Sequence, residues 1–452
     1  MRKQFYAGFL VVFFGTYYAI GQQNTLQVVG KNLTSINGQN IILRGVNYGL
    51  INQGDISLAD AAGYQSYIDE VANTGANAVR IPWYTSGQNW RDIPGPPNNG
   101  TPGTVDGYVT NGHLSNIIAY CISKKMIPIL SIHDDSYITC KDNWAYFNST
   151  VMDFWTDPDV LTLIEANKAY LIINLANEFD KVRWGAGSLA TELNTFKSNY
   201  SAAVATLRQA GVNVPIIIDA PDCGQSSTEL LSIAVDMNQN DTRHNLIFSS
   251  HAYWYGYAST LAQVQTKLNE AQNTNVCFIL GEVATNQDGD NGECGLNDLS
   301  TLYPIILDEV CSRNIGWLAW TFSLDCSSAR EMSPTGSASN LTTFGNDIIN
   351  NPNYGLKSTN GCGAVVIDES VGIDSKTSQV FSIEPNPAST NIAIHSAFSN
   401  CSLSIRNALG ELVLTEKHTK NSNVRIADFN PGIYFVELEN SQQTHIQKLI
   451  IY

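Results

Sequence analysis

Residues 170–178 read YLIINLANE, and residues 276–282 read VCFILGE. Each stretch is a nearly continuous apolar run that ends on a glutamate, Glu178 in the first and Glu282 in the second. Runs that are apolar at consecutive positions are typical of strands buried on both faces, as in a parallel sheet covered by helices. A charged group directly after such a strand is costly unless it is paired or hydrated. Both stretches therefore predict a buried parallel strand with a functional carboxylate at its end.

Six further runs of this kind precede residue 364, so the sequence predicts eight buried strands. The eight runs are Ile41–Tyr48, Ala78–Trp83, Met126–His133, Tyr170–Glu178, Val214–Asp219, Leu246–Tyr253, Val276–Glu282 and Gly316–Phe322. Segments with helical spacing lie between them, such as the apolar positions 64, 67, 68 and 71 before Gly75. Eight strand–helix units predict a (β/α)8 TIM barrel of the α/β class. A doubly wound sheet is the alternative, but neither G-x-G-x-x-G nor G-x-x-x-x-G-K-[ST] occurs.

Both ends of the chain depart from this pattern, so the barrel domain is expected over residues 22–363. Residues 1–21 join a basic head to a short apolar run and small residues, which predicts a secretory signal peptide. A membrane anchor is the alternative, although a span needs about 20 apolar residues. Residues 364–378 are acidic, small or β-branched and predict a linker. Residues 379–452 alternate apolar and polar positions between turn signals, which predicts a small all-β sandwich.

The charge balance restricts the kind of partner. Asp and Glu number 41 against 25 Lys and Arg, a net charge of -16. Such a surface repels phosphate backbones and anionic lipid headgroups. We therefore expect a neutral ligand and no nucleic-acid partner. The protein is also expected to be a monomer.

Nine cysteines are scattered along the chain, and no C-x-x-C pattern occurs. Zinc-ribbon and thioredoxin-like sites therefore have no support. Cys294 and Cys326 lie in polar stretches and can pair in an exported protein, as can Cys140 or Cys362 with a neighbour. Cys121 and Cys277 lie in apolar patterns, which predicts buried free thiols.

In a barrel, the C-terminal ends of the strands meet at one mouth, where the active sites of this fold lie. Besides the two glutamates, these ends carry an unusually polar set: Arg80, His133, Asp134, Asn177, His251, Tyr253 and Trp320. Glu178 and Glu282 end strands four and seven, which can aim their side chains at each other. One as proton donor and one as nucleophile would cleave a glycosidic bond with retention, if their carboxyls stand about 5–5.5 Å apart. The alternative is two glutamates salt-bridged to loop lysines.

The other strand ends suit supporting and substrate-binding roles. Arg80 can hold the nucleophile ionised, and Asn177 can bond a sugar 2-hydroxyl. Tyr253 can donate to the nucleophile, with His251 holding that network in place. Substrate-binding candidates carry rings or amides that can meet a sugar: His133, Trp320, Trp83, Trp254 and Asn47. His133 equally suits a place behind the substrate contacts, and about half of the loop tryptophans suit packing; the other loop candidates are Trp90, Trp144 and Trp184.

Seven short motifs occur in order along the predicted barrel. They are Arg44-Gly45-Val46-Asn47, Asn77-Ala78-Val79-Arg80-Ile81-Pro82, Ile132-His133-Asp134, Ala176-Asn177-Glu178, His251-Ala252-Tyr253, Leu280-Gly281-Glu282 and Trp317-Leu318-Ala319-Trp320. With them, residues 44–360 resemble a retaining glycoside hydrolase of family 5, in the (β/α)8 clan A. The resemblance implies Glu178 as acid/base and Glu282 as nucleophile, with no cofactor.

The sequence indicates the polysaccharide substrate less specifically than it indicates the reaction. The stretch from Asn340 to Asn346, with Tyr354 to Lys357, resembles the end of bacterial endo-β-1,4-mannanases, which implies β-mannan. Phe179 and Val283 depart from that pattern, and Pro82-Trp83 resembles endoglucanases, so cellulose or another plant glucan is the alternative.

The sequence leaves two other functions and one structural metal site to consider. An inactive polysaccharide-binding protein would have little chemical reason to keep both carboxylates. A metal-dependent hydrolase needs clustered ligands, but only four His precede the linker and no H-x-H or H-E-x-x-H occurs, so we expect no catalytic metal. The acidic stretch 288–293 could hold a structural calcium, although a solvated turn is the simpler interpretation.

The C-terminal segment carries its own ordered motifs. They are Ile383-Glu384-Pro385-Asn386-Pro387-Ala388, Leu409-Gly410-Glu411, Pro431-Gly432-Ile433-Tyr434-Phe435-Val436 and Gln447-Lys448-Leu449-Ile450-Ile451. The set resembles the C-terminal sorting domain of type IX secretion cargo. It implies the type IX machinery as a partner and a secreted or cell-surface location. An accessory β-domain without a sorting role is the alternative.

Overall fold

The computed structural model describes residues 24–49, 63–83, 85, 108–110, 112–134, 142–289, 293–323, 325–365, 381–407, 411–439 and 444–451. The chain divides into two compact units, Met1–Ile367 and Asp368–Tyr452. The predicted signal peptide lies outside the described residues, and so does the predicted linker apart from Ala364 and Val365. Within the described ranges, no helix has the length and apolar character that a membrane span requires.

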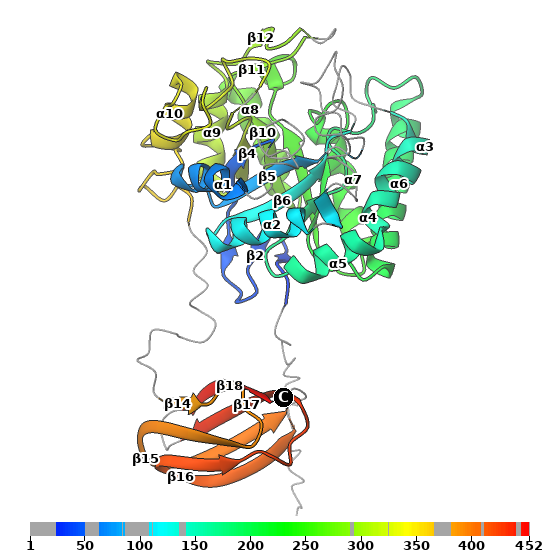
Figure 1. The fold of residues 1–452 in the computed structure, drawn as a ribbon. Helices are drawn as coiled ribbons and strands as arrows, with labels where there is room; N and C mark the ends of the chain where they lie inside the picture. The colour runs from blue at the N-terminus through cyan, green and yellow to red at the C-terminus, as the bar shows by residue number, and fades with distance from the viewer. Residues whose placement is uncertain are drawn as a thin grey trace, which may run out of the picture. The chain divides into compact units, whose positions relative to one another are not determined.

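Eight parallel strands close into a barrel in the first unit (Figure 1). In order around the barrel they are β4 (Arg44–Asn47), β5 (Ala78–Trp83), β6 (Ile127–Ile132), β7 (Ile172–Asn174), β8 (Ile216–Asp219), β9 (Leu246–His251), β10 (Cys277–Val283) and β13 (Gly316–Ala319). Seven of the predicted apolar runs contain one of these strands, and β10 extends one residue beyond the remaining run, Val276–Glu282; every residue in the strands is buried. The predicted (β/α)8 barrel is confirmed, and the doubly wound sheet is excluded.

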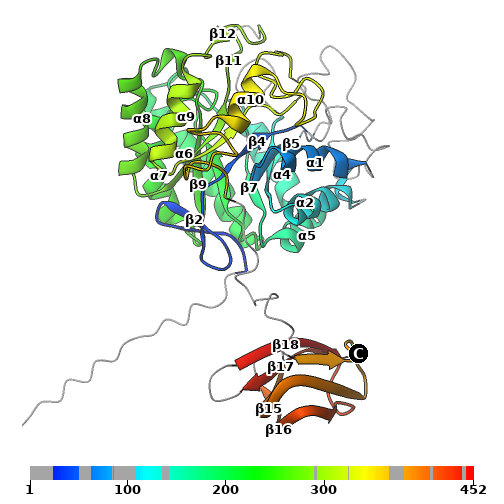
Figure 2. The ribbon, with the colours of Figure 1, turned by 90° about the vertical axis from the view of Figure 1, so that its left-hand side faces the viewer.

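Helices cover the outside of the barrel (Figures 1 and 2). The longer ones are α1 (Tyr64–Asn73), α2 (His113–Ser123), α5 (Pro158–Asn167), α6 (Leu189–Gln209), α7 (Ser227–Asn240), α8 (Leu261–Asn273), α9 (Tyr303–Ser312) and α10 (Thr343–Asn350). Shorter turns are α3 (Trp144–Tyr146), η3 (Phe147–Val151), α4 (Met152–Thr156) and η4 (Trp254–Gly256). In α1 the predicted apolar positions Ile68 and Val71 are buried, and Gly75 follows with φ +85°, a left-handed conformation that suits glycine after a helix.

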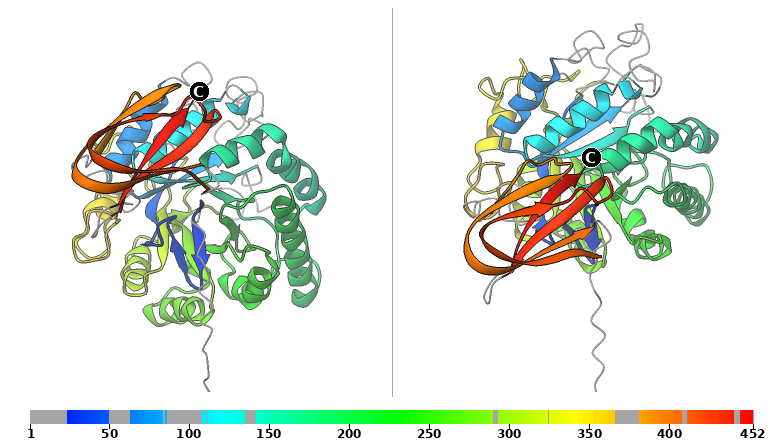
Figure 3. Two further views of the ribbon diagram at one scale, coloured as in Figure 1. Left: turned by 90° about the horizontal axis from the view of Figure 1, so that it is seen from below. Right: turned by 60° about the horizontal axis from the view of Figure 1, so that its bottom comes forward.

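A small antiparallel sheet packs against one end of the barrel (Figure 3). It consists of β1 (Gln27–Val29), β2 (Asn32–Thr34) and β3 (Asn40–Ile41). Its Leu26, Val28 and Leu33 share one apolar cluster with strand residues such as Ile127 and Ile217. Apolar side chains therefore fill the end where the barrel strands begin. The short strands β11 (Asn286–Gln287) and β12 (Asn297–Asp298) lie toward the opposite end (Figure 1).

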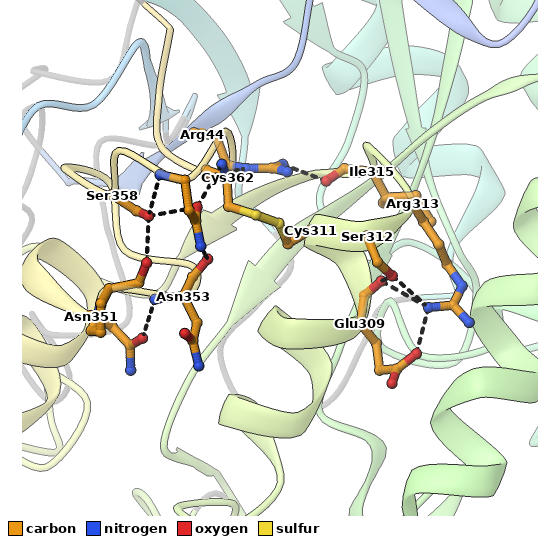
Figure 4. Close-up of a disulfide and its surroundings, with 12 residues drawn as sticks. Arg44, Glu309, Cys311, Ser312, Arg313, Ile315, Asn351, Asn353, Ser358 and Cys362 are labelled. Carbon is orange, nitrogen blue, oxygen red and sulfur yellow. Dashed lines mark hydrogen bonds and ion pairs between the residues drawn. A yellow bond between two sulfur atoms is a disulfide. The ribbon is translucent and has the colours of Figure 1, made fainter.

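Two disulfides lie among the described residues of the first unit. Cys294 pairs with Cys326, as the sequence predicts, and Cys311 pairs with Cys362. Figure 4 shows the second bridge, which joins the end of α9 to the segment after α10, beside the side chain of Arg44. The prediction that Cys121 and Cys277 are buried free thiols is confirmed. Cys140 lies outside the described residues.

The second unit is one antiparallel five-stranded sheet with its own apolar core. Its strands are β14 (Phe381–Glu384), β15 (Asn391–Asn407), β16 (Leu412–Arg425), β17 (Gly432–Glu439) and β18 (Thr444–Ile451). The long β15 pairs with β14 through its first half and with β17 through its second half, while β16 follows most of its length. The all-β prediction is confirmed. The alternation is imperfect at Leu412, which is exposed at the start of β16.

Candidate active site

Glu282 lies within β10, and each of its carboxylate oxygens has its own donor. Arg80, from β5, places Nη1 2.8 Å from Oε1. Tyr253, just after β9, donates its hydroxyl to Oε2 at 2.6 Å. The Glu282 side chain is only 5% exposed, so these contacts replace its hydration. A buried carboxylate held by a cation and a hydroxyl keeps one orientation.

Glu178 follows β7 and is bonded to His251. His251, at the end of β9, places Nδ1 2.6 Å from Glu178 Oε1 and 3.5 Å from Glu282 Oε2. His251 also lies against the ring of Tyr253, as expected of a residue that holds the Tyr253–Glu282 network in place. The bond to Glu178 is a further contact that the sequence did not predict. Glu178 also has φ +49°, a left-handed conformation that costs about 1–3 kcal/mol in a residue other than glycine.

Arg80 is the centre of a buried polar network. Its guanidinium, 1% exposed, also bonds to acceptors on neighbouring strand ends. These acceptors are Asn47 Oδ1 (3.0 Å), Asn174 Oδ1 (2.7 Å), Asn177 Oδ1 (2.6 Å) and Asp219 Oδ2 (3.2 Å). Asn47 is 0% exposed and donates its amide to the carbonyls of Gly281 and Ala319. The prediction that Asn47 binds substrate is therefore wrong in this structure, because its amide is used to position Arg80.

The two glutamates are close enough to act on one bond. Glu178, His251 and Glu282 each offer an atom within 4.8 Å of the other two. Burial raises the pKa of Glu178 to about 7; His251 opposes this rise, and the negative charges of Glu282 and Asp219 add to it. Glu178 can therefore keep its proton near neutral pH, while Glu282 is held by Arg80. Neither glutamate depends on a loop lysine among the described contacts, which removes that alternative.

Charge around His251 explains its protonation. Burial alone disfavours an imidazolium, but the negative charges of Glu282 and Asp219 raise the pKa of His251 to about 10. Burial would likewise raise the pKa of Asp219, yet His251 and Arg80 lower it to about 2. An imidazolium donates from both nitrogens and has no lone pair for a metal. The three clustered groups are therefore near enough for a metal ion but unsuited to one in this protonation state.

His133 and Trp320 lie against each other at the ends of β6 and β13. Their ring centroids are 5.9 Å apart and the rings are nearly parallel, at 9°. His133 is 1% exposed and Trp320 8% exposed. Burial, with the positive charges of Arg80 and His251, holds the pKa of His133 well below its usual range, so this ring is neutral. The pair forms the aromatic part of the site.

Two tryptophans proposed as substrate contacts are packing residues. Trp83 is fully buried between Tyr108 and Phe154, and Trp254 is fully buried in the main apolar core. Their assignment as substrate-binding residues is corrected, because neither ring reaches the surface. Among the loop candidates, Trp184 is 49% exposed, while Trp144 packs against aromatic rings that include Phe179. Trp90 lies outside the described residues.

Sequence reasoning missed two residues of the network, Asp219 and Asn174. Asp219 closes β8 as a fully buried carboxylate that faces both Arg80 and His251, 3.6 Å from His251 Nε2. Asn174 ends β7, bonds Arg80 and accepts from the Ser131 hydroxyl at 2.7 Å. For Asp219 the signal was present, because a charged residue ends an apolar run just as at Glu178. Asn174 gave no comparable signal, since it lies inside its run.

Two known proteins match about three quarters of this chain. The mannan endo-1,4-beta-mannosidase of Cellvibrio japonicus (strain Ueda107) is 27% identical over 347 residues, which cover 75% of this chain and 69% of that protein. The enzyme of the same name from Salipaludibacillus agaradhaerens is 25% identical over 354 residues, which cover 76% of this chain and 97% of that protein.

Solved structures share the fold. The catalytic domain of a mannanase from Streptomyces sp. SirexAA-E superposes with a TM-score of 0.57 at 20% identity, covering 77% of this chain and 96% of that one. The beta-mannanase from Thermomonospora fusca gives a TM-score of 0.55 at 21% identity, covering 73% and 96%. At these identities the likeness is one of fold.

Two family models match separate parts of the chain. Residues 382–452 match the secretion system C-terminal sorting domain. Residues 34–325 match the family described as cellulase (glycosyl hydrolase family 5). Because that second match spans more than half of the sequence, the chain belongs to glycosyl hydrolase family 5 and is a glycoside hydrolase.

Proposed function

We propose that the protein is a retaining endo-β-1,4-glycanase that hydrolyses plant polysaccharide, with β-mannan as its substrate. The observation that carries the proposal is the pair of carboxylates Glu178 and Glu282, within 4.8 Å of each other and held in different environments. Two carboxyl groups at this spacing leave no room for a water between them and the sugar, which is the arrangement of retaining glycosidases.

In the first step, Glu282 is the nucleophile and Glu178 the acid. A carboxylate oxygen of Glu282 forms a bond to the anomeric carbon while the bond from that carbon to the glycosidic oxygen breaks. Glu178 gives its proton to the leaving oxygen, so the departing chain end is a neutral hydroxyl. Arg80 and Tyr253 orient Glu282 for this attack.

In the second step, the Glu178 carboxylate takes a proton from water, and that water attacks the anomeric carbon. The ester bond to Glu282 breaks, the carboxylate is restored, and the product keeps its β-configuration. His251 donates to Glu178 at 2.6 Å and so stabilises the charge that Glu178 carries between the two steps. We assign the sugar 2-hydroxyl to the amide of Asn177, which precedes Glu178 in the chain, and the face of the sugar ring to Trp320.

The choice of mannan rests on the relatives. Both relatives described above are named mannan endo-1,4-beta-mannosidase, and they match about three quarters of this chain. Cellulose is the second candidate, because the matching family is described as cellulase. For the C-terminal unit, the match to a sorting domain supports export by type IX secretion to the medium or cell surface. The basic head and apolar run of residues 1–21 support a signal peptide that is cleaved first.

Reducing-sugar release from galactomannan, glucomannan, carboxymethylcellulose and xylan tests the proposal. We expect release from the two mannans, its loss in Glu282→Gln, and a fall of about 10²–10⁴-fold in Glu178→Gln. Glu165→Gln is the matched control, because its side chain is 61% exposed on α5. Release only from carboxymethylcellulose or xylan would overturn the assignment of β-mannan as the substrate. Binding without release from any of the four would contradict the enzymatic proposal, and an α-configured first product would contradict retention.

A further inference from the structure

The side chain of Trp320 is tied to a buried acidic group that the proposed mechanism does not use. Its indole Nε1 donates to Asp325 Oδ2 at 2.6 Å. The Asp325 side chain is fully buried. A hydrogen bond of this length to a carboxylate is charge-assisted and stronger than a bond between neutral groups.

Asp325 is in turn held by Arg330. Arg330 Nη2 lies 2.8 Å from Asp325 Oδ1, the carboxylate oxygen that Trp320 does not use. Arg330 Nη1 lies 2.9 Å from Asp288 Oδ1 on the loop after β10. The backbone of Ser327 also donates to Asp325 Oδ1, at 3.1 Å. Asp325 therefore has both oxygens bound and cannot turn without breaking several bonds.

The Cys294–Cys326 disulfide contacts the Arg330 guanidinium. Arg330 Nη2 is 3.4 Å from the sulfur of Cys326, and the bridge joins the loop after β10 to the loop after β13. The backbone NH of Thr321, next to Trp320, donates to the carbonyl of Arg330 at 3.0 Å. The disulfide, the guanidinium and the carboxylate are thus linked by contacts to the indole N–H.

Stability alone does not account for this arrangement. A buried ion pair contributes little net stability, because the desolvation cost offsets the attraction. The loop is already joined by the disulfide and by backbone bonds such as Met332 NH to Thr321 O, at 3.0 Å. What the carboxylate adds is a fixed direction for the indole N–H, and with it a fixed plane for the ring. A stacking surface acts on a sugar only when that plane is held.

We propose that Asp325 and Arg330 are positioning residues that fix the plane of Trp320 for a sugar ring at the cleavage site. The inference rests on the proposed function, in which Trp320 contacts the substrate. Asp325 acts on the substrate only through the indole, and Arg330 only through Asp325.

A double-mutant cycle on mannan hydrolysis by the full chain tests the coupling. In the wild-type background, Asp325→Ala is expected to lower kcat/KM about 10-fold, and Asp325→Asn less, because the amide oxygen still accepts the indole proton. In a Trp320→Phe background the same Asp325→Ala change should have less than a twofold effect, since phenylalanine has no N–H to hold. Equal losses in both backgrounds would show a merely structural role and overturn the proposal. Asp298→Asn is the matched control, because this carboxylate caps Ser300 at the surface of the same region.

A second readout does not depend on activity. In protein labelled with ¹⁵N-tryptophan, the indole signal of Trp320 is the one missing from Trp320→Phe. We expect it to lie downfield and to move upfield in Asp325→Asn and Arg330→Lys but not in Asp298→Asn. If the Trp320 indole signal does not move in Asp325→Asn, the hydrogen bond to Asp325 is contradicted and the proposal fails with it. If Trp320→Phe leaves kcat/KM unchanged, the sugar contact of the proposed function fails and the positioning role fails with it, whatever the indole signal does.

Discussion

Glu178 can act as the proton donor because its position in the fold raises its pKa. Burial raises its pKa to about 7, and His251 is the positive neighbour that keeps the pKa from rising further. A raised pKa means that the proton is present below about pH 7 and lost above it. The first chemical step needs that proton, so we expect kcat/KM to fall as the pH rises through about 7.

Replacing His251 by asparagine tests this account. The substitution removes the charge and the hydrogen bond that lower the pKa of Glu178, so the alkaline limb of kcat/KM should move to higher pH while the maximal rate falls. The measurement is a pH profile on soluble mannan. His244→Asn is the control, because that ring is bonded to the carbonyl of Asn238, outside the site. A limb that moves to lower pH would contradict the role assigned to His251.

At the scale of elements, α6 is joined to the end of α7 by a buried ion pair. Arg208, near the end of α6, holds both oxygens of Asp241, at 2.9 and 3.0 Å, and the two side chains are 3% and 0% exposed. The same guanidinium donates to the carbonyls of Val212 and Val214. Burial would raise the pKa of Asp241, but Arg208 lowers it.

We expect Arg208→Met to destabilise the first unit by about 3–5 kcal/mol, because it leaves a buried carboxylate without its partner. Since the folded-state pKa of Asp241 is lowered, the pair's contribution is present above the ordinary pKa of about 3.9 and lost as the pH falls below it. The destabilisation should therefore be full at pH 7 and shrink in acid. Urea unfolding of the wild type and of Arg208→Met, at pH 7 and in acid, measures this destabilisation. Lys168→Ala, which removes an exposed partner of Glu165, should cost less than about 1 kcal/mol; a similar loss there would refute the argument from burial.

The disulfide between Cys311 and Cys362 joins α9 to the segment that ends the first unit (Figure 4). It encloses a sequence separation of 51 residues, for which the loss of chain entropy in the unfolded state corresponds to about 4 kcal/mol. Arg44, at the start of β4, donates to the Cys362 carbonyl at 3.2 Å, so the bridge lies at the strand-start end of the barrel and away from the glutamates.

We therefore expect the double variant Cys311→Ser, Cys362→Ser to lose about 2–4 kcal/mol of stability and to keep its kcat/KM at 25 °C. Denaturant unfolding and mannan hydrolysis on the same preparation measure the two quantities. A large fall in kcat/KM with little change in stability would show that the bridge acts on the site instead.

At the scale of the whole molecule, the two units have separate apolar cores. The barrel core and the cluster at its strand-start end contain residues of the first unit only, and the third cluster contains residues of the second only. Independent cores predict independent unfolding. All residues proposed for the chemistry belong to the first unit.

A chain ending at Ile367 should therefore hydrolyse mannan with a kcat/KM within about twofold of the full chain. Calorimetry of the full chain should show two transitions, of which the shortened chain keeps one. If shortening removes activity although the remaining transition is unchanged, the second unit has a role in hydrolysis beyond sorting.

The sequence by itself determined the architecture and the two carboxylates. Strands of a closed parallel barrel are buried on both faces, so each appears as a continuous apolar run such as Ala78–Trp83, and eight runs gave eight strands. Glu178 and Glu282 were visible for the same reason, because a charge stands out at the end of such a run. The period-two alternation of the second unit was equally local, and its failure at Leu412 shows its limit.

Only the tertiary structure decided which side chains meet and which are covered. His251 bonds Glu178 because the end of β9 lies within reach of the segment that follows β7. Spacing along the chain carries no such information. Trp83 and Trp254 are covered by rings and core residues distant in sequence, so their burial was invisible beforehand. Asp325 behind Trp320 depends on two loops that a disulfide brings together. Pairing and burial are properties of neighbours in space, whereas periodicity is a property of neighbours in the chain.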